Sequence, residues 1–156
     1  MIVVRTYLKT DDQFIDIDEF QGELADDRYI VGAIELSIDG LVLIDKSFWD
    51  LIEQLWSYLL AGMTSILEGK PYRAYFPDHP VPFQLTPDLE RRIVEMSMME
   101  GLERVAASAP LGAFVSEMAR EARRFYERLH RLLPQNAYRR QFAQLQAIER
   151  ACASLK

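Results

Sequence analysis

The chain contains few of the residues that most often bind metals or attack substrates. Its 156 residues include one cysteine, Cys152, and two histidines, His79 and His130. A single cysteine excludes an internal disulfide, and its place in a late helical pattern predicts a small buried apolar residue, not a reactive thiol. Neither His-x-x-x-His nor Cys-x-x-Cys occurs, so we expect no transition-metal site.

Several functional patterns are also missing. There is no run of about 18 apolar residues, so we expect no membrane span. The first residues lack the basic-then-apolar order of a signal peptide. The P-loop, Gly-x-Gly-x-x-Gly, Gly-x-Ser-x-Gly and the EF-hand loop do not occur. The sequence therefore predicts no catalytic residue, no cofactor and no metal ion, and with its single cysteine it favours a cytoplasmic location.

Charge is unevenly distributed along the chain. Residues 1–69 hold fourteen acids and four bases, a net charge of −10, whereas residues 70–156 hold ten acids and fourteen bases, a net charge of +4. The whole chain carries a net charge of −6, which argues against general binding of nucleic acid. The imbalance indicates that the sequence is informative about surfaces and protein partners.

The acids are most concentrated in residues 11–27, the acidic segment, which contain no lysine, arginine or histidine. Apolar residues such as Phe14, Ile17 and Phe20 lie between the acids and can dock on a core, unlike the residues of a disordered acidic tail. The segment is either a polar connection between two strands or an acidic face held for a basic partner. In the second interpretation the partner-binding residues are Asp11, Asp12, Asp16, Asp18, Glu19, Glu23, Asp26 and Asp27.

The first half of the chain predicts strands followed by a helix. Ile2–Leu8 and Tyr29–Ile38 are rich in β-branched and apolar residues, and Asp39-Gly40 then predicts a tight hairpin into Leu41–Ile44. Ser47–Glu68 predicts a buried helix with its first residue as the N-cap and Asp50 at its third position. Gly69 is expected to end this helix, and its two tryptophans are expected to pack in the core.

The second half predicts a mixture of strands and helices. Tyr72–Phe76 is expected to be a short strand, followed by a rigid proline-rich loop over residues 77–82. Residues 86–108 fit either a helix or a hairpin, and we favour the hairpin. Leu111–Leu133 and Tyr138–Leu155 predict two antiparallel helices. Together the patterns predict one α+β domain over residues 1–156, with an antiparallel β-sheet packed against two or three helices.

A second charged cluster occupies the predicted C-terminal helices. Interleaved Glu117, Glu121 and Glu127 favour an ion-paired, solvated helix face. A phosphate-binding surface, a contact with the acidic segment inside the fold and a self-association surface that makes a homodimer are the other interpretations. The basic residues are Arg120, Arg123, Arg124, Arg128, Arg131, Arg139 and Arg140.

Four parts of the chain resemble a known group of proteins. They are the hairpin at Tyr29–Gly40, the Trp-bearing stretch Phe48–Trp56, the Tyr75–Asp78 loop and the closing Phe125–Leu129 stretch. This pattern resembles the small acidic immunity proteins of bacterial polymorphic-toxin and contact-dependent growth inhibition systems. The resemblance implies an inhibitor that binds a cognate toxin domain, often a basic nuclease, and it carries over no individual functional residue.

Two functions from other classes compete with this one. His79 beside Asp78 in the proline-rich loop could form an acid–base pair, which would suit a small-molecule enzyme. The Arg-rich helix could instead serve a structural or oligomeric accessory protein. We favour binding and neutralisation of a basic partner, because opposite potentials speed up encounter and select the partner.

Overall fold

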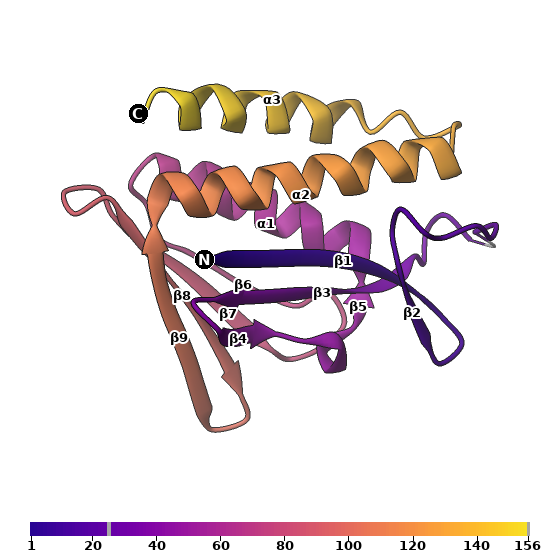
Figure 1. The fold of residues 1–156 in the computed structure, drawn as a ribbon, viewed down its shortest axis with the longest axis horizontal. Coiled ribbons are helices and arrows are strands. Elements are labelled where there is room, and N and C mark those ends of the chain that lie inside the picture. The colour runs from indigo at the N-terminus through magenta and orange to yellow at the C-terminus, as the bar shows by residue number, and fades with distance from the viewer. Residues whose placement is uncertain (25, 156) are drawn as a thin grey trace.

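The protein consists of two antiparallel β-sheets and three α-helices in a computed structural model that describes residues 1–24 and 26–155 (Figure 1). The first sheet has the order β2-β1-β3-β4, with β5 also paired to β3, and its strands are β1 (Ile2–Thr10), β2 (Gln13–Asp16), β3 (Val31–Ile38), β4 (Leu41–Ile44) and β5 (Asp50–Leu51). The second has the order β6-β7-β8-β9, with strands β6 (Tyr72–Tyr75), β7 (Pro82–Asp88), β8 (Ile93–Glu100) and β9 (Glu103–Pro110). The helices are α1 (Ile52–Leu67), α2 (Leu111–Leu132) and α3 (Arg139–Ala153), and a 3-10 turn, η1 (Lys46–Phe48), precedes β5.

The α+β class predicted from the sequence is confirmed, with two antiparallel sheets in the described residues where one was expected. The predicted hairpin joins β3 to β4. Asp39 and Gly40 both have positive φ, at 49° and 84°, as a two-residue turn that matches the strand twist requires. Gly69 likewise has a positive φ of 79° just after α1, where the helix was expected to end.

The first helix begins later than predicted. Ser47 does not cap α1 but lies in η1, where its backbone N–H donates to the Asp45 side chain at 2.8 Å. Asp50 is not the third residue of the helix, because it pairs with Gly32 of β3 as part of β5. Residues 47–51 therefore form a turn and a strand pair, and the helix starts at Ile52.

The region of residues 82–110 is a three-stranded meander. The favoured hairpin is confirmed as β8 and β9, which extend away from the rest of the protein (Figure 1). The sequence did not reveal β7, whose last residues, 86–88, fall in the stretch of residues 86–108 that fitted either a helix or a hairpin. Pro87 is tolerated because it lies beyond residues 82–85, which pair with β6, so this end of β7 has a neighbouring strand only on its β8 side.

Helices α2 and α3 run antiparallel, as predicted, and α3 forms the outer layer on α2 (Figure 1). Cys152 is buried and its Sγ lies 3.5 Å from the Gly112 carbonyl oxygen, so the start of α2 meets the end of α3. Trp56 of α1 is fully buried, as expected, and stacks on Phe125 of α2 at 6.4 Å between ring centroids. Trp49, by contrast, is 39% exposed and does not belong to the core. Of the helices in residues 1–24 and 26–155, none is long and apolar enough to cross a membrane.

Candidate functional site

The acidic segment is anchored to the core at two apolar side chains. Ile17 is 0% exposed and Phe20 is 3% exposed, and the Ile17 N–H donates to the Thr6 carbonyl oxygen of β1 at 3.1 Å. The apolar residues thus dock in the way the sequence predicted. Seven of its eight acidic residues are exposed, and six of them are not bound by Arg124: Asp11, Asp12, Glu19, Glu23, Asp26 and Asp27.

The other two acids are bound within the fold by Arg124 of α2. Its guanidinium donates to Asp16 at 2.8 Å and to Asp18 at 2.7 Å, and it also binds Glu121 of the same helix at 2.6 Å. The hydrogen bond to Glu121 is the main reason that the pKa of Arg124 is raised. Burial favours a higher pKa for Asp16, but the hydrogen bonds from Arg124 and from the Asp18 backbone outweigh it, so the pKa of Asp16 is lowered.

Arg128 attaches the same segment through its backbone. Its Nε donates to the Ile17 carbonyl oxygen at 3.1 Å, and its Nη2 donates to the Phe20 carbonyl oxygen. Arg124 and Arg128 therefore lie against the acidic segment inside the fold, one of the arrangements considered from the sequence. Two of the eight predicted partner-binding acids, Asp16 and Asp18, are consequently part of the structural framework.

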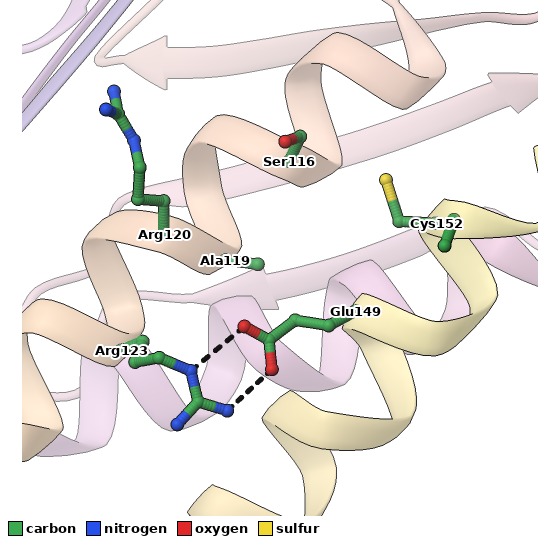
Figure 2. Close-up of a pocket in the computed structure, with 7 residues that line it drawn as sticks. Ser116, Ala119, Arg120, Arg123, Glu149 and Cys152 are labelled. Carbon is green, nitrogen blue, oxygen red and sulfur yellow. Dashed lines mark hydrogen bonds and ion pairs between the residues drawn. The ribbon is translucent and has the colours of Figure 1, made fainter. Parts of the chain in front are cut away.

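Two of the remaining arginines are paired with glutamates. Arg120 binds Glu117, and Arg123 binds Glu149 of α3 at 2.9 Å and Glu127 at 3.6 Å. Figure 2 shows the Arg123–Glu149 pair beside a cavity of about 260 Å³ between α2 and α3, into which Ser116 and Cys152 also face. Because the guanidinium of Arg123 is already bound by carboxylates, this cavity offers little free charge to a ligand. The other three patch residues, Arg131, Arg139 and Arg140, are exposed on the surface, as Arg120 is.

His79 pairs with Asp50 and not with its neighbour Asp78. The Asp50 side chain is 0% exposed, and its Oδ2 lies 2.8 Å from Nδ1 of His79, whose side chain is 42% exposed. The same carboxyl group accepts the backbone N–H of Asp78 at 3.1 Å and that of Leu51 at 2.6 Å. Asp50 thus holds the proline-rich loop against β5, and His79 pairs with a different acid from the one considered for the competing enzyme function.

An aromatic and cationic surface covers the outward face of the first sheet, and the sequence analysis did not identify it. The Lys9 ammonium lies 4.7 Å from the ring centroid of Trp49, which also meets His79 edge-on at 5.8 Å. The Lys46 ammonium lies 4.4 Å from the ring centroid of Tyr7. Alternation along β1 was the available signal, because residues of one parity face outward while Val4, Thr6 and Leu8 face the core.

A hollow of about 500 Å³ lies on this face beside the acidic segment. Burial, together with a hydrogen bond to Glu35, raises the pKa of Tyr7 to about 12, so its phenol stays neutral at physiological pH. The residues that line the hollow are Arg5, Tyr7, Phe14, Ile15, Asp16 and Glu19. The hollow therefore combines aromatic rings with carboxylates, a combination that suits a cation.

A search for metal-binding groups and for similar proteins gives no further indication of function. Within residues 1–24 and 26–155, no group of three or more His, Cys, Asp or Glu side chains is arranged to hold a metal ion. Comparison with protein-family models, with curated proteins and with solved structures finds no match for this chain. We accordingly infer the function from the geometry of the protein's own surfaces.

Proposed function

We propose that the protein binds a basic partner protein, a cognate toxin domain, through the acidic segment and neutralises it at a ratio of one to one. The observation that supports this function is the display of six exposed acids that Arg124 does not bind, on a segment anchored by Ile17, Phe20, Arg124 and Arg128. The resemblance to immunity proteins supports the same partner class.

The anchoring of the segment favours binding by reducing its entropy cost, and the carboxylates favour it through their charge. A flexible acidic tail would lose conformational entropy when a partner orders it, whereas a segment whose residues 16–20 are already held on the core loses less. Crowded exposed carboxylates also repel one another, and a basic partner relieves that repulsion. Opposite potentials further accelerate encounter and disfavour acidic competitors.

The test measures association of the purified protein with the toxin domain that we expect to be encoded beside its gene. Reversing Asp12, Glu19, Glu23 and Asp27 to lysine should slow association at least tenfold at low salt, because these acids create the attracting potential. Asp16 and Asp18 are left intact, since they bind Arg124. Added salt should slow association of the wild-type protein and have little effect on the variant.

The matched control applies the same change in net charge elsewhere on the surface. Four exposed acids outside the segment, reversed together to lysine, should slow association far less, and they are Glu68, Glu90, Glu100 and Glu103. Equal slowing in both variants would show that net charge alone matters. Wild-type association that does not depend on salt would contradict the proposal.

One observation favours an enzyme as the second candidate function. The buried Asp50 orients the half-exposed His79, which gives that histidine the orienting carboxylate that an acid–base residue needs. The two functions differ in stoichiometry, because an inhibitor saturates at one equivalent of partner and an enzyme turns over.

A further inference from the structure

Two aromatic rings that line the hollow on the outward face of the first sheet already bind a cation from within the chain. The Lys46 ammonium lies 4.4 Å from the ring centroid of Tyr7 and 6.0 Å from that of Phe14. Both rings line the hollow. An ammonium over two aromatic faces is the arrangement in which the ring quadrupoles attract positive charge. Lys46 therefore shows which chemistry this surface accepts.

The charged groups around the hollow are also suited to a cation. Its lining carries two carboxylates, on Asp16 and Glu19, against one guanidinium, on Arg5. Arg5 Nη1 lies 3.9 Å from Asp16 Oδ2, and Arg124 also binds Asp16, so Glu19 supplies the carboxylate that a further cation would meet. Glu19 is exposed at the rim and belongs to the acidic segment, so the hollow opens beside the surface proposed to meet the partner.

We propose that this hollow receives an arginine side chain of the basic partner, which displaces Lys46 from the faces of Tyr7 and Phe14. This inference rests on the proposed function, and it identifies the group of the partner that is recognised. A guanidinium fits better than an ammonium, because its plane stacks on aromatic rings and its N–H groups can bind the Glu19 carboxylate. Lys46 acts as an internal competitor that keeps the rings covered in the free protein.

The test uses an acetylated, amidated tetra-arginine peptide, with titrations followed by NMR and calorimetry. Binding should shift the ring signals of Tyr7 and Phe14 and weaken about three- to tenfold in Tyr7→Leu and Phe14→Leu. Lys46→Gln should strengthen binding, because it removes the competitor. Lys70→Gln, which makes the same charge change at a residue paired with Glu68, controls for net charge and should have the smaller effect. A tetra-lysine peptide should bind more weakly than the arginine peptide.

The outcomes separate this inference from the proposed function. If Lys46→Gln strengthens peptide binding no more than Lys70→Gln does, or if folded Tyr7→Leu binds like the wild type, the hollow is not the arginine site. The proposed function would still stand if reversal of Asp12, Glu19, Glu23 and Asp27 slowed association with the toxin domain. If both Lys46→Gln and Tyr7→Leu change peptide binding as expected but that reversal has no effect, the hollow binds cations and the proposed function fails.

Discussion

Arg124 of α2 and Asp16 of β2 stand 108 positions apart in the sequence, and their side chains meet at 2.8 Å. The same guanidinium binds Glu121, which is 7% exposed. One side chain therefore neutralises a nearly buried glutamate and fastens the acidic segment to the helix. This arrangement separates the acids that hold the fold from those that face a partner.

Removing Arg124 should destabilise the protein. Arg124→Ala leaves Glu121 and Asp16 without their main cationic partner, and we expect a loss of about 2–3 kcal/mol, less than for a fully buried pair because the site is partly exposed. Arg120→Ala, one turn away on the same helix and 77% exposed, should change stability by less than about 0.5 kcal/mol. Denaturant unfolding of both variants measures the difference. Equal effects would show that the Arg124 network is not structural.

Asp16 should also contribute to acid sensitivity. Its pKa is lowered in the folded state from 3.8, so the unfolded state takes up a proton first as the pH falls. The stability that depends on ionised Asp16 is present above about pH 4 and is lost as the pH falls through the lowered pKa. Asp16→Asn should therefore reduce the loss of stability between about pH 4 and pH 2. Asp12→Asn, at an exposed position, is the control and should leave the pH profile unchanged.

The two tryptophans should differ sharply in their effect on stability. Trp56 is fully buried and its Nε1 donates to Oγ1 of the buried Thr6 at 3.2 Å, so Trp56→Ala should cost about 3–5 kcal/mol. Trp49→Ala should cost less than about 2 kcal/mol, because Trp49 is partly exposed beside Lys9. Chemical denaturation followed by circular dichroism measures both. A cost below about 1 kcal/mol for Trp56→Ala would contradict its place in the core.

The parts of the fold that could be predicted are those specified by neighbouring residues. The Asp39-Gly40 pair specifies its own turn, because both positions adopt positive φ. Helix α2 follows from an apolar period of 3.6 residues, and the structure places it at Leu111–Leu132, within one residue of the predicted range. Such signals need no knowledge of the rest of the chain.

The start of α1 could not be predicted, because distant residues determine it. Asp50 is a good helix-start residue by local rules, yet it pairs with Gly32 and accepts the N–H of Asp78. These contacts bridge segments far apart in the sequence, and they replace the first turn of the expected helix. Strand β7 was missed for a related reason. A proline such as Pro87 is compatible with a strand at an edge position, and the sequence alone does not show where β6 stops pairing with β7.

The candidate site likewise has features that neighbouring residues predict and features that depend on distant residues. Ile17 and Phe20 predicted that the acidic segment would dock, because alternating apolar residues within an acidic run have a core to contact. The division of its acids between framework and surface depends on Arg124, which no local pattern connects to Asp16. The hollow was missed because Lys46 and Phe14 meet only through the pairing of β2 and β3 with β1.

Two glycines should respond to alanine in opposite ways. A Cβ on Gly32 would lie 2.2 Å from the backbone carbonyl oxygen of Tyr7, which is fixed in the strand pair, so Gly32→Ala should destabilise by about 2–3 kcal/mol. A Cβ on Gly112 would meet no atom within 4 Å, and alanine is the better helix former. Gly112→Ala should therefore stabilise by about 0.5 kcal/mol. Thermal unfolding distinguishes the two variants, and a stable Gly32→Ala would show that β1 and β3 can separate locally.

The contact between Asp50 and His79 should be structural, and this can be tested together with catalysis. Asp50→Ala removes a buried acceptor from the N–H groups of Asp78 and Leu51, so it should destabilise by about 2–3 kcal/mol. Asp78→Ala keeps its own backbone N–H and should have little effect on stability.

His79→Ala should leave neutralisation of the toxin domain intact, with saturation at one equivalent. Titration of the toxin's activity with each folded variant decides the matter, because removing a true general base typically lowers a rate by about 10²–10⁴. Inactivation of many equivalents of toxin by the wild type, lost in His79→Ala, would show that the protein is an enzyme.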